Sequence, residues 1–256
     1  MKNIFLKNSQ GHEDMYPYSD IKMLRKILRD IKCHFEFDND CKFGEGVRID
    51  NYVNIGRNVI IGNDARIGPY TSIGDDCVIG ENVKTKMYLH IANNVTIGNN
   101  VKINDNIVIG NRVKIGNNTD IDTCTNIFHD TYIGAHVDIG KFVNISQHTT
   151  IEDNVIIDNS VRIINNTIIK SRSLISRLFH FRGSNHVVDC YSNDMIRVGC
   201  EMHSTNHWIK NFKAIGKNNG YTDKEITEYK KYIVHSAKMQ KIYHQAEAFK
   251  NYNLTE

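Results

Sequence analysis

The chain has 256 residues, of which 40% are hydrophobic and 24% charged, and its formal net charge is +3. These values are typical of one globular domain with a small appendage, and the charge balance gives no sign of a nucleic-acid-binding surface. No segment approaches the roughly 18 apolar residues that span a membrane. Because the start lacks an apolar signal core and the six cysteines include no CxxC pair, we expect reduced thiols and a cytoplasmic protein.

The first predicted element is a short amphipathic helix that follows Ser19, a favourable N-cap residue. Its apolar residues share one face at helical spacing, namely Ile21, Leu24, Leu28 and Ile31. We interpret residues 1–42 as an N-terminal helical cap that covers an exposed strand edge of the next domain. A partner-binding helix is the alternative.

From Phe43 to Ile169 an apolar residue recurs at every sixth position. Of these 22 positions 20 are isoleucine, and only Thr85 is not apolar. A second series of small or β-branched residues stands four positions later, from Val47 to Thr167. A period of six fits no α-helix, but it fits a short strand and a corner, repeated three times in each 18-residue coil. Residues 43–174 therefore predict an all-β parallel solenoid of about seven coils without inserted loops.

Glycine usually follows the isoleucine, and asparagine or aspartate often comes next. Because these residues tolerate positive φ angles, we expect them to form the corners. Residues eighteen apart then become vertical neighbours, about 4.8 Å from each other.

The motif Ile-Gly-x-x-Val-x, as in residues 55–60, resembles the hexapeptide-repeat family over about half of the chain. The resemblance implies a left-handed parallel β-helix, whereas ordinary parallel crossovers are right-handed. It also implies assembly as a homotrimer.

After Ile169 the period stops, and residues 175–256 are predicted to form a C-terminal appendage of a hairpin and helices. The hairpin strands are residues 186–191 and 195–200. A short helix is expected to hold Trp208 and to end at Gly216. Residues 222–225 form a capping box that opens a helix to about Lys250.

The segment from Ile127 to Gly134 carries the candidate chemistry, because His129 and Asp130 are adjacent at a predicted corner. One coil later Gln147 lies above His129, and His148 above Asp130. A neutral histidine is suited to remove a proton near neutral pH, and a carboxylate beside it stabilises its charged form. The pattern indicates a general-base site. A polar surface histidine on a structural prism is the alternative.

The motif His129-Asp130-x-x-Ile133-Gly134 is similar to the catalytic segment of the UDP-N-acetylglucosamine O-acyltransferases of lipid A synthesis and of related nucleotide-sugar N-acetyltransferases. The resemblance implies His129 as the general base, with support from Asp130 and His148. It places the Gln147 N–H where the family has an oxyanion donor. It further implies acetyl-CoA or another acyl thioester as a co-substrate, a sugar acceptor, and a site in a cleft between subunits.

Several positions depart from the lipid A enzyme. Asn218 and Asn219 stand where that enzyme has paired arginines, and Asn126 and Ile164 replace two of its histidines. We therefore expect acyl transfer, by preference of acetyl, to a hydroxyl or amine of a sugar, but not lipid A synthesis itself.

Residues 159–188 contain no acidic residue. They contain five basic ones, namely Arg162, Lys170, Arg172, Arg177 and Arg182. Such a patch suits the phosphates of coenzyme A. A basic rim or a trimer contact is the alternative.

We also consider two hypotheses of a zinc site, and we expect neither site to be present. A zinc site would use cysteine and histidine of the appendage, namely Cys190, Cys200, His203 and His207. A zinc carbonic anhydrase of this fold would draw on interface histidines, and the candidates are His90, His129, His136 and His148. The rival to an enzyme is a non-catalytic trimeric scaffold or binding module that works through its appendage.

Overall fold

The computed structural model describes residues 2–7, 12–31, 35–38 and 40–253. The chain divides into two compact units, residues 1–173 and 174–256. No helix within the described ranges is long and apolar enough to cross a membrane.

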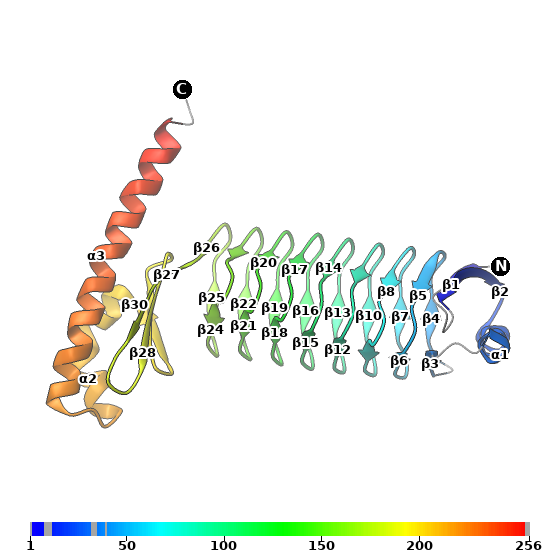
Figure 1. Cartoon of the computed structure of the whole chain (residues 1–256), viewed down its shortest axis with the longest axis horizontal. Coiled ribbons are helices and arrows are strands. Elements are labelled where there is room, and N and C mark those ends of the chain that lie inside the picture. The colour runs from blue at the N-terminus through cyan, green and yellow to red at the C-terminus, as the bar shows by residue number, and fades with distance from the viewer. Residues whose placement is uncertain (1, 8–11, 32–34, 39, 254–256) are drawn as a thin grey trace. The chain divides into compact units, whose positions relative to one another are not determined.

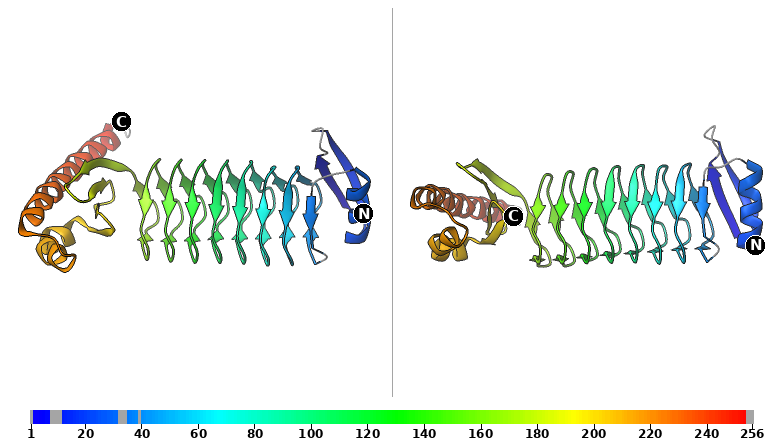
Figure 2. Two further views of the ribbon diagram at one scale, coloured as in Figure 1. Left: turned by 60° about the horizontal axis from the view of Figure 1, so that its bottom comes forward. Right: turned by 90° about the horizontal axis from the view of Figure 1, so that it is seen from below.

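The first unit is a left-handed parallel β-helix with three sheets, as predicted, and its stacked coils are seen in Figures 1 and 2. Sheet A contains β5 (Val47–Ile49), β8 (Arg66–Ile67), β11 (Lys84–Thr85), β14 (Lys102–Ile103), β17 (Asp120–Ile121), β20 (Asp138–Ile139) and β23 (Ile156–Ile157). Sheet B contains β3 (Phe35–Phe37), β6 (Val53–Ile55), β9 (Ser72–Ile73), β12 (Leu89–Ile91), β15 (Ile107–Ile109), β18 (Asn126–Ile127), β21 (Asn144–Ile145) and β24 (Arg162–Ile163). Sheet C contains β4 (Lys42–Phe43), β7 (Ile60–Ile61), β10 (Val78–Ile79), β13 (Thr96–Ile97), β16 (Lys114–Ile115), β19 (Tyr132–Ile133), β22 (Thr150–Ile151) and β25 (Ile168–Ile169).

The two six-residue series form the core of the column. Every member of the first series from Phe43 to Ile169 is buried, and equivalent isoleucines stack in register, as Ile79, Ile97 and Ile115 do. Thr85 fits among them because its hydroxyl accepts a hydrogen bond from the Gly68 N–H at 2.9 Å. The column has about eight turns, one more than predicted, because β3 pairs with β6 before the isoleucine series begins.

The corners differ from the prediction in one respect. The positive φ angle falls three residues after the isoleucine, as at Asn58 and Asn82, and lies between 53° and 61° in every coil from Tyr52 to Arg172. The glycine that follows the isoleucine is needed for space instead. A Cβ atom on Gly80 would come within 2.5 Å of the carbonyl oxygen of Gly98 in the next coil.

Asparagine and aspartate side chains join successive coils at the corners. The Asn93 N–H donates to Oδ1 of Asn111 at 2.9 Å, and the Asn99 N–H donates to Oδ1 of Asn117 at 2.7 Å. We call such a vertical series of side-chain-to-backbone bonds an Asx ladder. Because each bond joins residues eighteen apart, the ladders hold the coils in register.

A hairpin and a helix precede the column. Strand β1 (Lys2–Lys7) pairs antiparallel with β2 (Glu13–Tyr18) and parallel with β5, so it covers the edge of sheet A and buries Ile4 and Leu6. Sequence analysis did not predict this hairpin. Helix α1 (Ile21–Ile31) begins as expected, and Leu24 is buried.

The cap of α1 is Asp20 rather than Ser19. The Asp20 carboxylate accepts the Met23 N–H at 2.9 Å, and the Ser19 hydroxyl donates to that carboxylate. A carboxylate one residue closer to the helix reaches the free N–H groups of the first turn better. The side chains of Leu28 and Ile31, predicted on the buried face, lie outside the described ones.

The second unit begins with β26 (Leu174–Ile175) and has a four-stranded antiparallel sheet in the order β27-β28-β29-β30. The strands and helices are β27 (Arg177–Arg182), β28 (Val187–Tyr191), β29 (Met195–Val198), β30 (Glu201–Ser204), α2 (Thr205–Asn218) and α3 (Asp223–Asn253). The predicted hairpin and both helices are present, whereas β27 and β30 were not predicted. The Glu225 carboxylate accepts the Thr222 N–H at 2.7 Å, which confirms the capping box.

The closeness of successive coils predicts different effects on stability at two neighbouring corner positions. We expect Gly80→Ala to lower the free energy of unfolding by about 1–3 kcal/mol, because the added methyl group would force two coils apart. Asn82→Gly should change it by less than about 1 kcal/mol, because glycine also adopts a positive φ. Guanidinium denaturation of both variants measures this. An unchanged midpoint for Gly80→Ala would contradict the spacing argument.

Candidate functional site

The candidate site lies on the edge of the column where each coil passes from sheet B to sheet C. We call this edge corner 3. His129 and Asp130 occupy this corner between β18 and β19, and Gln147 and His148 occupy it one coil later. The His148 N–H donates to the carbonyl oxygen of His129 at 3.2 Å. The eighteen-residue repeat thus places the four sequence-predicted residues on two successive coils of one edge.

The carboxylate of Asp130 is held by residues from the coils on either side. Arg112 donates from Nε at 2.6 Å and from Nη2 at 2.8 Å, and Nδ1 of His148 lies 3.9 Å from Oδ2. The hydrogen bond from Arg112 is the main cause that lowers the pKa of Asp130, and both histidines add to it by their charge. Sequence analysis missed Arg112, although the eighteen-residue register identifies it as the residue below Asp130.

Adjacent residues at this corner point their side chains in different directions. Asp130 has a φ of 56°, as do the equivalent residues Arg112 (58°) and His148 (56°), so these three side chains form one vertical column. His129 stands in the neighbouring column. Its ring contacts the half-exposed Phe128 edge-on, with 6.4 Å between ring centroids. Among the described residues Asp130 therefore bonds Arg112 and faces His148, rather than bonding His129.

The Asx ladder of corner 3 ends below His129. The N–H groups of Arg57, Asp75 and Asn93 each donate to the Asx side chain one coil above, at 2.8–2.9 Å. An imidazole replaces that side chain at His129 and a longer amide replaces it at Gln147. Within the described ranges, no acceptor is bonded to the N–H of His129 or Gln147. This stretch of the edge therefore presents unbonded backbone donors beside an imidazole.

The basic residues predicted to bind coenzyme A are spread over several parts of the structure. Arg162 points outward from β24 on sheet B, whereas Lys170 and Arg172 lie at the corner between sheets C and A. Lys170 is bonded to Glu152 at 2.7 Å. Arg177 belongs to β27 of the second unit, where it lies 3.9 Å from Asp189. Because the chain passes through all three sides of the column every eighteen residues, basic residues that are close in sequence lie on different sides.

The residues of the zinc hypothesis in the second unit have other partners. Cys190 is buried, which raises the pKa of its thiol to about 11, and its Sγ contacts the carbonyl oxygen of Ser236. His203 pairs with Glu201 at 3.0 Å and stacks on His207. Within the part of the chain that the structure describes, no three His, Cys, Asp or Glu side chains are grouped to hold a metal ion.

The structure resembles solved transferases at low sequence identity. The UDP-N-acetylglucosamine acyltransferase of Francisella novicida is 20% identical, with a TM-score of 0.48, and the match covers 77% of this chain and 76% of that one. The Campylobacter jejuni enzyme of the same name is 17% identical, with a TM-score of 0.41 and coverage of 77% and 81%. PerB from Caulobacter crescentus, solved with CoA and GDP-perosamine, is 16% identical, with a TM-score of 0.28 and coverage of 61% and 62%.

No curated protein matches the chain in sequence. Two overlapping segments, residues 40–75 and 58–92, match the family model described as bacterial transferase hexapeptide (six repeats). The same six-residue period continues beyond them to Ile169. Residues 40–92 of the β-helix therefore match the hexapeptide repeat of bacterial transferases.

Proposed function

We propose that the chain is an acyltransferase that moves an acetyl group from coenzyme A to a hydroxyl or amine of a nucleotide-linked sugar. The observation that carries this proposal is the change at corner 3, where an Asx ladder gives way to His129 beside unbonded N–H groups. The ladder is also interrupted elsewhere, as at Ala135, but among the described ladder positions only residue 129 replaces the Asx side chain with an imidazole. The transferase type of the repeat supports the same reaction class.

In this proposal His129 is the general base. Its neutral imidazole takes the proton from the acceptor as the acceptor oxygen or nitrogen attacks the thioester carbonyl carbon. The negative charge then moves onto the carbonyl oxygen, where the Gln147 N–H donates a hydrogen bond. When the carbon–sulfur bond breaks, the proton held by His129 passes to the thiolate, which gives the acetylated acceptor and free coenzyme A.

Arg112, Asp130 and His148 support the site as one vertical column of side chains. Arg112 lowers the pKa of Asp130, and the carboxylate lies 3.9 Å from Nδ1 of His148, one coil above His129. The two hydrogen bonds from Arg112 to Asp130 also fix the backbone of the residue next to His129.

For binding of the donor we propose that Arg162 contacts its phosphates, since Lys170 and Arg172 lie at another corner and Arg177 belongs to the second unit. Arg162 suits this role best, because it lies on sheet B beside corner 3 and its guanidinium matches phosphate geometry. Acetyl-CoA is here a co-substrate rather than a bound cofactor.

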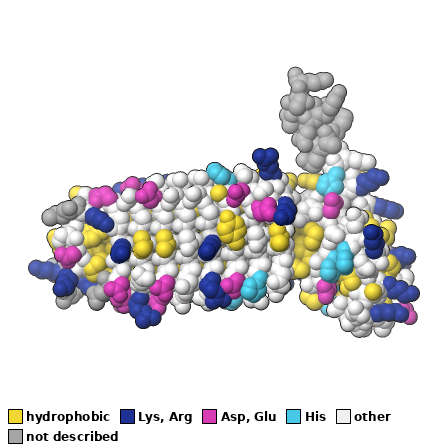
Figure 3. Space-filling view, turned by 180° about the vertical axis from the view of Figure 1, so that it is seen from behind, with side chains coloured by type: hydrophobic (Ala, Val, Ile, Leu, Met, Phe, Trp, Pro, Cys, Tyr) yellow, Lys and Arg dark blue, Asp and Glu magenta, His cyan; other side chains and the backbone are white. Residues whose placement is uncertain are grey.

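We also propose that the protein is a homotrimer. A ligand needs a concave site, whereas corner 3 of one column is a convex edge, so a neighbouring column would have to form the cleft with it. Hydrophobic side chains form an interrupted row along one face of the β-helix in Figure 3. Sheet C carries four exposed apolar side chains, namely Ile60, Val78, Tyr132 and Ile168. Sheet B has only Val108 of this kind among the described residues. Sheet C adjoins corner 3, so a neighbour packed there would form the second wall of the site.

A binding module is the second candidate function. It is favoured by a cavity that lies wholly within the second unit and is lined by aromatic side chains. A protein of this kind would show no acetyl transfer, and its β-helix would serve only to assemble three such units.

The base assignment predicts a large loss of activity in His129→Ala. With acetyl-CoA and a panel of amino and hydroxy sugar nucleotides, we expect kcat/KM to fall about 10²–10⁴-fold. The release of free thiol measures the rate. His136→Ala, which removes an exposed histidine from another corner, should keep full activity. Full activity in His129→Ala, or a panel without any acceptor, would refute this function.

The Arg112–Asp130 pair predicts a change in pKa. Arg112→Gln should raise the pKa of Asp130 toward its ordinary value, because the main cause that lowers it is removed. A carboxyl with a lowered pKa in the folded state adds stability at neutral pH, which is lost as the pH falls through that pKa. Carbon NMR titration of the carboxyl measures the shift. Arg57→Gln is the matched control, because it should raise the pKa of Asp75 only.

The interface assignment predicts that one valine substitution breaks the trimer and another does not. Val78→Glu places a charge on sheet C, and we expect monomers in sedimentation velocity because an unpaired charge cannot be buried in the interface. Val108→Glu makes the same change at a side chain of similar exposure on sheet B (46% against 39%) and should leave the trimer intact. If Val108→Glu gave monomers and Val78→Glu remained a trimer, the interface would not lie on sheet C.

A further inference from the structure

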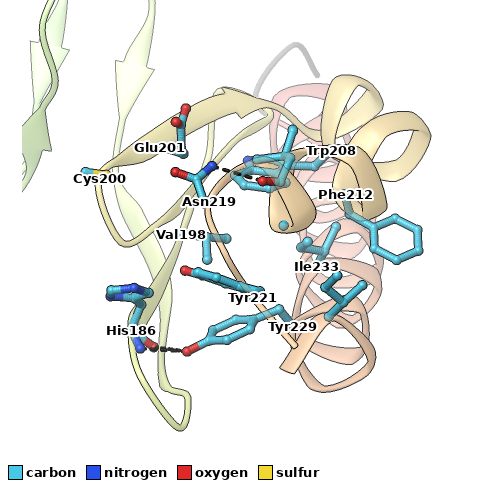
Figure 4. Close-up of a pocket in the computed structure, with 13 residues that line it drawn as sticks. His186, Val198, Cys200, Glu201, Trp208, Phe212, Asn219, Tyr221, Tyr229 and Ile233 are labelled. Carbon is cyan, nitrogen blue, oxygen red and sulfur yellow. Dashed lines mark hydrogen bonds between the residues drawn. The ribbon is translucent and has the colours of Figure 1, made fainter. Parts of the chain in front are cut away.

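The second unit contains a cavity of about 80 Å³ between its sheet and its two helices (Figure 4). We propose that this cavity binds a small organic ammonium ion, with the apolar body of the ligand on an aromatic floor and its cationic group at a carboxylate. The proposal rests on the second unit alone and does not depend on acyl transfer.

The floor of the cavity consists of rings whose polar atoms are already bonded. Trp208 is 3% exposed, and its Nε1–H donates to the carbonyl oxygen of Ile196 at 2.7 Å. The hydroxyl oxygen of Tyr229 accepts the N–H groups of Asn185 and His186 at 3.0 and 2.6 Å. These two side chains therefore offer the ligand only ring surface. Aromatic ring faces attract both apolar groups and cations.

The polar residues at the rim offer hydrogen-bond acceptors. The amide Nδ2 of Asn219 donates to the carbonyl oxygen of Ile215 at 3.0 Å, which leaves Oδ1 toward the side of Cys200 in Figure 4. Glu201 is bonded to His203 through Oε2 at 3.0 Å, so its second oxygen is available. An anionic oxygen and an amide oxygen together suit a ligand that donates hydrogen bonds.

The charge of the lining also favours a cation over an anion. Thirteen residues line the cavity, and they include Glu201 but no lysine or arginine. A phosphate or a carboxylate would meet the Glu201 charge without an arginine to offset it. Tyr221 lies beside His186, and its pKa is raised to about 12, mainly because the phenol is partly buried and further because Tyr229, Cys200, Glu225 and Glu201 lie near it. The phenol is therefore neutral at physiological pH and adds a further uncharged ring.

The chain has a single tryptophan, and Trp208 lines the cavity, so its fluorescence reports directly on occupancy. We would titrate the full-length protein with three probes that share a three-carbon chain, because a cavity of about 80 Å³ is smaller than the roughly 150 Å³ cavity that takes up benzene. They are propylammonium, 1-propanol and butyrate. We expect a saturable change with the ammonium probe, binding about tenfold or more tighter than the alcohol, and the weakest binding for the carboxylate.

Glu201→Gln keeps the size of the side chain and removes its charge. We expect this variant to lose the preference for the ammonium probe over the alcohol, because the anionic acceptor is gone. Asp223→Asn, which neutralises an exposed carboxylate outside the lining, should leave the preference unchanged. The absence of saturable binding by the ammonium probe, or equal binding of all three probes, would overturn the proposal. The probe series on the unmodified protein decides this even if Glu201→Gln does not fold.

Discussion

The close contact between successive coils is the constraint on which the first unit depends. Residues eighteen apart lie one strand spacing from each other, which leaves no room for a Cβ atom at positions such as Gly80. The same closeness stacks the isoleucines inside the column and lets an Asx side chain reach the backbone of the next coil. Core packing, register and corner geometry are therefore consequences of one vertical distance.

The candidate site follows from the same constraint. Any side chain at a corner has its partners eighteen residues before and after it, and Asp130 accordingly meets Arg112 and His148. Where His129 and Gln147 replace Asx side chains, the N–H groups of Asn111 and His129 lose the acceptor that the ladder would have supplied. In the proposed function, the change from Asx to histidine within a structural repeat would supply a base beside hydrogen-bond donors, and a second subunit would complete the cleft.

The second unit is organised on a different principle. An antiparallel sheet and two helices enclose a core that contains Val188, Ile196, Trp208, Tyr229 and Ile233. This arrangement has an interior cavity of its own, whereas the groove along sheet A of the column is open to solvent. The two units thus differ in what each can do alone: the repeat builds long, regular edges, whereas the appendage encloses a cavity.

The sequence by itself determined the elements that depend on local pattern. The period of six identified the inward residues, the coil length and the vertical neighbours, and the capping box at Thr222 marked the start of α3, because these features depend on spacing alone. Tertiary structure decided the rest. Strand β1 finds its partner β5 about forty residues away, so no local signal marks it. The positive φ of Asp130 turns its carboxylate toward Arg112 and His148, a direction that adjacency to His129 did not reveal. The winding of the chain also separated Arg162 from Lys170 and Arg172, because residues that are close in sequence lie on different sides of the column.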